Sequence, residues 1–324
     1  MTEKLWKSLG SGIYCVDAGY IKPGIACCYL IVEAGEVAIV ETGTSHTVPT
    51  IMSLLAELNL SPEAVRYIIP THVHLDHAGG AGVLMEQCPN AELVIHPRGA
   101  RHMADPEKLV AGTIAVYGEK KFAALYGDIP PVDSSRIIAA EDGRVINLNG
   151  RMLDVRDTPG HADHHFCIWD EQSKGWFSGD TFGISYQGMS LTNGRYIIPT
   201  TTPVQFNPDK LVASVQLLMS YRPERFYLTH YGMVESAEAL ATQLMEQIEQ
   251  MAALALRVEG GDNTEQMIER GLQQLVTERA AAIQPDFNKT ALADLLAMDV
   301  HLNAQGLAVW LERRKGVLAK AGRT

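Results

Sequence analysis

The residues most capable of chemistry in this sequence are three histidines that fall within six positions. His72, His74 and His77 lie close together, and Asp76 stands beside the last of them. Imidazole and carboxylate groups suit zinc, iron and manganese, and this cluster offers more ligand capacity than core packing requires. In an extended segment residues 72, 74 and 76 project to one side, and a turn at residues 76–77 swings His77 toward a second point. Two histidines can therefore hold one ion while Asp76 and His77 hold another.

The alternative is a loop that is rich in histidine by chance. However, the cluster directly follows an apolar segment, residues 65–70, which has the composition of a buried strand. It is closed by Ala78, Gly79 and Gly80, small residues that let the backbone turn tightly. This placement favours a functional loop.

Three later apolar segments each deliver a metal-binding side chain just past their end. Residues 152–156 lead to His161, residues 175–178 lead to Asp180, and residues 225–228 lead to His230. Loops at the ends of rigid strands are where proteins usually position a site. We therefore expect these three side chains to join the histidine cluster.

The elements that must position these residues follow from composition and periodicity. Predicted strands lie at residues 12–17, 26–32, 37–40, 65–70, 93–96, 136–139, 144–148, 152–156, 166–169, 175–178 and 225–228. Predicted helices lie at residues 48–60, 82–87 and 208–221, and an inserted helical segment occupies about 98–130. After residue 235 the composition shifts to Ala, Leu, Gln, Glu and Met, which predicts three or four helices at 236–257, 264–281, 289–296 and 303–319. We thus predict a catalytic domain at 1–234 and a C-terminal helical region at 235–324.

The candidate ligands, taken in chain order, resemble the signature of the metallo-β-lactamase-fold hydrolases, most of all that of their glyoxalase II-like branch. The four parts of the signature are His72-x-His74-x-Asp76-His77, His161, Asp180 and His230. The resemblance covers about residues 12–232, and the motif is highly specific. It implies an α/β (α+β) fold of the αββα sandwich type, in which two sheets lie face to face with helices outside and metals at one edge. A helical insertion and a C-terminal helical extension would be added to this sandwich.

The resemblance also implies a ligand set for two divalent metal ions, with zinc expected first and iron or manganese as alternatives. One ion would be held by His72, His74 and His161; the other by Asp76, His77 and His230; Asp180 would bridge them.

Two features depart from the family pattern. The usual Asp-x-Gly after the third strand is here Glu41, Thr42 and Gly43. Because that carboxylate mainly braces the ligand loop, we expect its replacement to shift the surroundings of the ligands. The long gap between His77 and His161 contains the inserted helical segment, which we expect to cap the site and reshape access to it.

Such a centre predicts hydrolysis by a metal-bridging hydroxide. Two divalent ions about 3.5–4 Å apart lower the pKa of a bound water to near 7 and stabilise the developing oxyanion. Asp76 is the predicted catalytic residue, because its second carboxylate oxygen can orient the nucleophile and pass on its proton. The sequence has no Gly-x-Ser-x-Gly elbow that would indicate a serine nucleophile. We expect an ester-type bond to be cleaved, first of all a thioester or ester.

Other activities fit parts of the same pattern. A lactonase or a phosphodiesterase would use the same two ions. A mononuclear-iron persulfide dioxygenase, which the superfamily also contains, would need only His72, His161 and Asp180. A regulatory protein could keep the metals with little turnover. Met189 and Leu191 stand roughly where glyoxalase II carries a Lys and a Tyr, which argues against glutathione thioesters.

Three further side chains are candidates for binding substrate. Tyr186 follows Asp180, and Tyr231 follows His230, so either phenol could donate a hydrogen bond to an oxyanion. His164, three positions after His161, could face the pocket; the alternative for all three is a packing role.

The composition excludes some classes of binding partner. The chain has 324 residues with 27 Lys and Arg against 38 Asp and Glu, a net charge of −11. This argues against nucleic acid, whose binding depends on basic residues. Five scattered cysteines indicate a reducing compartment, and neither a secretory signal nor an apolar run of about 18 residues appears. We expect a cytoplasmic protein with a small-molecule substrate and no membrane partner. By analogy with other helix-rich C-terminal segments, we also expect a homodimer.

Overall fold

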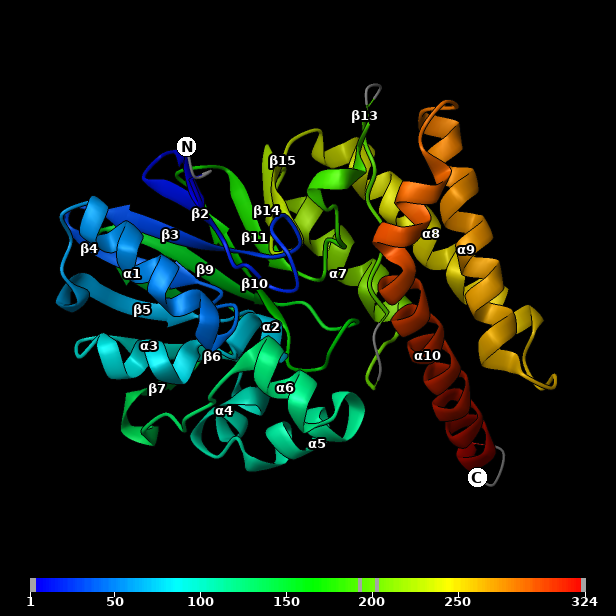
Figure 1. The fold of residues 1–324 in the computed structure, drawn as a ribbon, viewed down its shortest axis with the longest axis horizontal. Helices are drawn as coiled ribbons and strands as arrows, with labels where there is room; N and C mark the ends of the chain where they lie inside the picture. Colours follow the sequence, from blue (N-terminus) through cyan, green and yellow to red (C-terminus); the bar gives the residue numbers. More distant parts are fainter. Residues whose placement is uncertain (1–3, 192–193, 202–203, 322–324) are drawn as a thin grey trace. The chain divides into compact units, whose positions relative to one another are not determined.

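The computed structural model describes residues 4–191, 194–201 and 204–321 (Figure 1). The chain forms two compact units, each built from several stretches of sequence. Unit 1 comprises Met1–Asp157, His164–Gly179 and Pro223–Glu235, and unit 2 comprises Thr158–Asp163, Asp180–Arg222 and Ser236–Thr324. The division into residues 1–234 and 235–324 stays a prediction.

The first sheet of unit 1 has seven strands in chain order. They are β1 (Trp6–Gly10), β2 (Ile13–Asp17), β3 (Cys27–Glu33), β4 (Glu36–Val40), β5 (Val65–Ile69), β6 (Glu92–Ile95) and β7 (Ile137–Ala139). β1 to β4 are antiparallel neighbours, whereas β4 to β7 pair in parallel. The turn between β3 and β4 has positive φ at Ala34 and Gly35, as a two-residue hairpin requires.

The second sheet of unit 1 has six strands in the order β15-β14-β11-β10-β9-β8. Their bounds are β8 (Val145–Leu148), β9 (Arg151–Asp157), β10 (Phe166–Asp170), β11 (Gly175–Gly179), β14 (Arg225–Leu228) and β15 (Gly232–Val234). β11 and β14 are parallel, so the chain leaves both strands at the same edge of this sheet.

The two sheets of unit 1 face each other across a shared core. Ile31 on β3 and Leu153 on β9 belong to this core and are fully buried. Tyr29 on β3 meets the ring of Phe177 on β11 at a centroid distance of 5.3 Å, and Phe177 stacks on Tyr227 at 4.5 Å. Burial of these large rings between the sheets is a main stabilising contribution to unit 1.

Helices complete unit 1 at the strand connections. They are α1 (Val48–Glu57), α2 (Leu75–Ala78), α3 (Ala81–Gln87), α4 (Pro97–Ala104), α5 (Glu107–Tyr117) and α6 (Glu119–Tyr126). α1 buries Val48, Ile51, Leu54 and Leu55, which recur at helical spacing. α4, α5 and α6 form the predicted helical insertion between β6 and β7.

Unit 2 consists mainly of helices. They are α7 (Pro208–Ser220), α8 (Ala237–Arg257), α9 (Thr264–Ile283) and α10 (Lys289–Ala321), accompanied by the small hairpin of β12 (Ser190–Leu191) and β13 (Gly194–Arg195). The prediction of separate helices at 289–296 and 303–319 was wrong, because α10 is continuous. Asn303, a residue typical of helix starts, lies inside α10 and is buried, where its side chain accepts from Thr201 N and donates to Pro199 O.

None of the helices in the described part of the chain combines the length and the apolar character needed to cross a membrane.

Candidate metal centre

The histidine cluster lies where the chain leaves β5 and turns into α2. β5 is a parallel strand in the interior of the first sheet, and its last residue, Ile69, is fully buried. The backbone stays extended at His74 and becomes helical at Leu75. The chain thus turns at Leu75, before the predicted turn at residues 76–77, and this change of direction separates His72 and His74 from Asp76 and His77.

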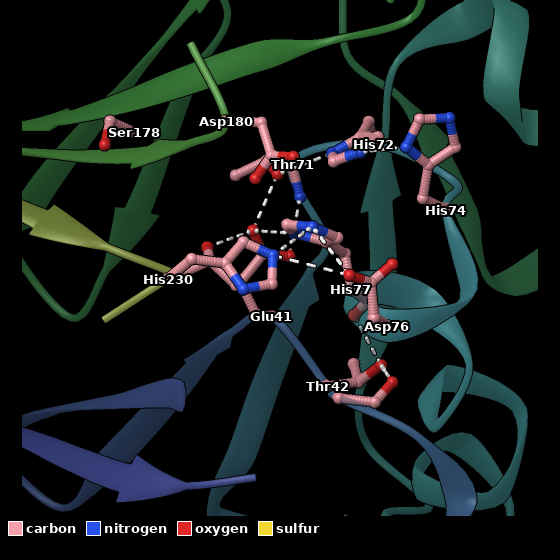
Figure 2. A network of polar contacts seen from close by, with 12 residues as sticks. Glu41, Thr42, Thr71, His72, His74, Asp76, His77, Ser178, Asp180 and His230 are labelled. Atoms are coloured by element: carbon pink, nitrogen blue, oxygen red, sulfur yellow. Dashed lines mark hydrogen bonds and ion pairs between the residues drawn. The ribbon is translucent and has the colours of Figure 1, made fainter. Parts of the chain in front are cut away.

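Asp76, His77 and His230 turn their ligand atoms toward one point in unit 1 (Figure 2). The Nε2 atoms of His77 and His230 are 3.3 Å apart, and they lie 3.6 and 3.4 Å from Oδ2 of Asp76. A tetrahedral zinc ion with bonds of about 2.0–2.1 Å places its ligand atoms about 3.3–3.4 Å apart. The three donors therefore fit one divalent ion in both chemistry and spacing.

The opposite ring nitrogens of the two histidines are anchored to the protein. His77 Nδ1 lies 3.0 Å from Glu41 Oε1, and His230 Nδ1 lies 3.0 Å from the carbonyl oxygen of Ile25. Both partners are acceptors, so each Nδ1 carries the proton and each Nε2 presents its lone pair to the ion position. This is the arrangement by which proteins orient histidine ligands.

The Asp76 carboxyl is held in its ionised form. Burial raises its pKa, but the neighbouring His77 and His230 outweigh burial and bring the pKa well below its usual range. The side chain of Asp76 is 22% exposed, whereas that of His77 is 1% exposed. Asp76 is therefore the member of this group that a substrate or water can reach most readily.

Glu41 connects three segments around the ligands. Its Oε1 atom accepts hydrogen bonds from Thr71 Oγ1 at 2.6 Å, Thr229 Oγ1 at 2.9 Å and His77 Nδ1 at 3.0 Å, while Oε2 accepts from Thr71 N at 3.1 Å. The side chain is 1% exposed. The longer side chain thus braces the ligand loops from the position where the family usually carries Asp. The sequence pointed to this bracing role because Glu41 stands where the family's Asp-x-Gly motif begins.

His72 and His74 form the second group of predicted ligands in unit 1. His72 is fully buried, and its Nε2 atom lies 2.8 Å from His74 Nδ1. Its Nδ1 atom lies 3.1 Å from Thr71 Oγ1, whose proton is given to Glu41. The His72 ring is 4.1 Å from the His77 ring, so all five predicted ligands of unit 1 are close together.

The other two predicted ligands belong to unit 2, where they form a pair. His161 Nε2 lies 3.4 Å from Asp180 Oδ2, and His161 Nδ1 lies 3.4 Å from the carbonyl oxygen of Thr200. Asp180 directly follows β11 in the chain. That all seven residues bind one pair of ions stays a prediction.

The three candidates for substrate binding have different surroundings. Tyr186 is buried in unit 2 and donates to Asp299 Oδ1 at 2.7 Å, and Tyr231 is part of the core between the sheets of unit 1. His164 stacks on His72 at a centroid distance of 6.1 Å. Burial, followed by the charge of His74, lowers the pKa of His164 to about 3, so this ring is neutral at physiological pH. Their roles toward a substrate stay predictions.

The fold and this site are those of one superfamily of metal-dependent hydrolases. The family model described as the metallo-beta-lactamase superfamily matches residues 21–230, and the chain belongs to this superfamily.

Individual members of the superfamily share low sequence identity with this chain. The metallo-beta-lactamase fold-containing protein ST1585 of Sulfurisphaera tokodaii is 25% identical over 228 residues, 69% of this chain and 79% of the relative. The human acyl-coenzyme A thioesterase MBLAC2 is 28% identical over 205 residues, 57% of this chain and 67% of the relative. A hydroxyacylglutathione hydrolase of Francisella tularensis subsp. novicida is 37% identical over 92 residues, 28% of this chain and 33% of the relative, in accord with a glyoxalase II-like branch.

A solved structure confirms the fold class. The crystal structure of ST1585 from Sulfolobus tokodaii matches with a TM-score of 0.64 and 22% identity, and the match covers 92% of this chain and 99% of that one. A match of this extent is in accord with the predicted α/β sandwich with a C-terminal helical extension.

Proposed function

We propose that this superfamily member hydrolyses acyl thioesters, with two divalent metal ions at the predicted site. The observation that carries the proposal is the convergence of Asp76 Oδ2, His77 Nε2 and His230 Nε2 at distances of 3.3 to 3.6 Å. Donors with this spacing suit a divalent ion, and the superfamily to which the chain belongs takes its name from a metal-dependent hydrolase.

The residues of the chain have separate roles in this reaction. When bound, the metal ions supply a hydroxide at neutral pH and positive charge for the developing oxyanion. Asp76 would orient the attacking hydroxide, and its carboxylate would take the proton from that group and pass it to the leaving thiolate. Glu41 keeps the His77 ring in the orientation that this requires. No side chain of the protein needs to form a covalent intermediate.

Two observations favour a thioester over a nucleic-acid substrate, and a third bears on glutathione conjugates. The similarity to the thioesterase MBLAC2 extends over most of that relative. The net charge of −11 disfavours a polyanionic substrate such as nucleic acid. Met189, which stands roughly where glyoxalase II carries a Lys, is uncharged and fully buried, so it offers no positive charge to glutathione. We therefore propose a small-molecule thioester other than a glutathione conjugate.

The test is a substrate panel with the metal-loaded full-length protein. Acyl-coenzyme A thioesters, aryl esters, lactones and bis-p-nitrophenyl phosphate are compared at equal enzyme and metal concentration. We expect kcat/KM for a thioester to exceed that for the phosphodiester by at least about 100-fold, and chelation to abolish turnover. Metal and oxygen measurements accompany the panel. One iron per chain with oxygen consumption, and no ester or thioester cleavage, would instead support the persulfide dioxygenase alternative.

A further inference from the structure

The residues that precede α7 contact the loop that carries His161. His161 Nδ1 lies 3.4 Å from the carbonyl oxygen of Thr200, and Asn207 N donates to Gly160 O at 2.8 Å. The loop and these residues all belong to unit 2. We call residues 199–201 and 204–207 the support segment.

The support segment is held on its other side by one face of α10. Asn303, Trp310 and Arg313 are separated by seven and three residues, which places them on the same side of the helix. The Trp310 ring meets the ring of Phe206 edge to face at a centroid distance of 6.4 Å. Arg313 Nη1 donates to a backbone carbonyl of the support segment at 2.9 Å. The C-terminal helix therefore fixes the residues that contact the His161 loop.

Asn303 and His161 are bonded to the same peptide group, which joins Thr200 to Thr201. Asn303 Oδ1 accepts from Thr201 N at 2.6 Å, and the Thr200 carbonyl oxygen is the atom that meets His161 Nδ1. Asn303 Nδ2 also donates to Pro199 O at 3.0 Å, and Asn303 O accepts from Thr201 Oγ1 at 2.9 Å. A peptide group is planar and nearly rigid, so fixing its N–H also fixes the direction of its C=O. Asn303 thus sets the direction of the carbonyl that faces His161.

The Thr200 carbonyl determines which nitrogen of His161 can bind a metal ion. A carbonyl oxygen only accepts hydrogen bonds, so the proton of the neutral imidazole lies on Nδ1 and the lone pair on Nε2. His161 Nε2 lies 3.4 Å from Asp180 Oδ2, the spacing of two ligand atoms around one zinc ion. Thr200 Oγ1 lies 3.5 Å from the same Nδ1 atom and can accept from it as well. A rotated peptide group would therefore weaken the support that fixes the orientation and the tautomer of this ligand.

Packing alone does not call for an asparagine at position 303. The side chain is 2% exposed, and burying an amide costs free energy unless hydrogen bonds compensate for it. Ala304 and Leu307 beside it on α10 are fully buried apolar residues, and alanine also favours the helix more than asparagine does. The amide is therefore explained by the backbone groups that it holds and not by the space that it fills.

We propose that Asn303 is a positioning residue for the predicted metal ligand His161, and that it acts through the peptide group between Thr200 and Thr201. The C-terminal helical extension then helps to form the metal centre by orienting one of its ligands. This inference rests on the proposed function, because it takes His161 as a ligand. It does not depend on which substrate the centre hydrolyses.

The first test measures the metal affinity of the full-length, metal-free protein by titration with Co²⁺ and by competition for Zn²⁺ with a chromophoric chelator. The variant is Asn303→Ala, and the matched control is Gln247→Ala on α8. Gln247 is also a fully buried helix amide, and its Nε2 donates to Ile197 O at 2.7 Å, just before the support segment. We expect both variants to lower the midpoint of thermal unfolding of the metal-free protein, because each loses buried hydrogen bonds. Only Asn303→Ala should weaken one of the two metal-binding steps, by about tenfold.

The second measurement needs no change at Asn303. A long-range ¹H–¹⁵N spectrum of the zinc-loaded wild type should show His161 protonated at Nδ1 and bound to zinc through Nε2, with its signals assigned by their loss in His161→Gln. In Asn303→Ala the Nδ1 proton should exchange faster with solvent, and in Gln247→Ala its exchange should match the wild type. A wild-type His161 that carries its proton on Nε2 would overturn the inference, even if neither variant folds.

The outcomes separate this inference from the proposed function. Equal metal affinity in Asn303→Ala and Gln247→Ala shows that the inference is wrong, and if the wild type cleaves thioesters, the proposed function stands without it. If metal affinity depends on Asn303 but the wild type cleaves no thioester, the inference holds and the thioester proposal fails. A wild type that binds neither Co²⁺ nor Zn²⁺ overturns both.

Discussion

Glu41 holds the loops around the metal centre together through its hydrogen bonds. One of its carboxylate oxygens serves Thr71, Thr229 and His77 together, and these residues follow β5, follow β14 and belong to α2. An ionised carboxylate is needed for this, because three donors point at one oxygen. The longer side chain in place of the family's Asp therefore preserves the bracing role.

Replacing Glu41→Gln tests this role. The amide keeps an acceptor but loses the negative charge that supports the proton on His77 Nδ1, so we expect metal affinity to fall about 10- to 100-fold. Competition with a chromophoric chelator measures the change. Glu171→Gln, at an exposed position, is the control. Equal affinity in both variants would show that Glu41 has only a packing role.

Asp180 is predicted to bridge the two metal ions. We expect Asp180→Ala to lower metal content from two ions toward one per chain and to reduce kcat/KM by at least about 100-fold, because an ion contributes several kcal/mol to stabilising the transition state. The protein should stay folded by circular dichroism. Asp154→Ala on β9 is the matched control. Full metal content and full turnover in Asp180→Ala would contradict the assignment.

The sequence names candidate ligands but does not show what surrounds them. The spacing of His72, His74, Asp76 and His77 follows from local backbone geometry, which a sequence displays directly. The hydrogen bond between the hydroxyls of Tyr20 and Tyr126 joins residues 106 positions apart in the chain, and no periodicity links them. Which hydroxyl meets which carboxylate is decided by tertiary packing, so only the structure could reveal it.

At the scale of elements, the loop that carries His161 is fitted closely against the start of α7. A Cβ atom at Gly160 would lie 2.4 Å from backbone atoms of Leu211, and φ at Gly160 is +139°. Gly160 O accepts from Asn207 N at 2.8 Å, and Pro159 O accepts from Ser214 Oγ at 2.6 Å. Only glycine allows this approach of loop and helix.

We therefore expect Gly160→Ala to lower the free energy of unfolding by about 2–4 kcal/mol and to weaken metal binding, because the loop must move away from α7. Urea denaturation and metal titration measure the two effects. Gly150→Ala is the control, since Gly150 also has positive φ but would meet nothing within 4 Å. Its cost should be limited to backbone strain of about 1 kcal/mol. Equal effects of the two variants would show that close packing is not the cause.

Most elements with a strong pattern were predictable, and the exceptions have physical causes. β1 and β15 were missed because β1 is largely exposed and β15 has only three residues, so neither shows a hydrophobic period. The predicted break of α10 before Asn303 was wrong, because Asn303 lies inside the continuous helix. Its hydrogen bonds to Thr201 and Pro199 satisfy the side chain inside the helix, a tertiary effect that composition does not show.

At the scale of the whole molecule, metal binding and folding should be coupled, because the ligands come from segments far apart in the chain. Binding to the folded state alone adds about 4 kcal/mol to the free energy of unfolding when free ion is 1,000 times Kd. We expect chelation to remove about this amount, as measured by urea unfolding with and without chelator. Asp180→Ala should show a smaller loss. Superimposable unfolding curves with and without chelator would show that the folded chain binds no ion tightly.

All five cysteines, Cys15, Cys27, Cys28, Cys88 and Cys167, are buried free thiols in unit 1. Thiol-reactive reagents should therefore leave the native chain untouched, and a single cysteine introduced at the surface would be labelled without background. Met152 in unit 1 and Met267 in unit 2 are 46% and 43% exposed and suit this purpose. Because the native thiols do not react, a pair of spin labels or fluorophores at these two positions would report the distance between the two units while substrate and metal are added.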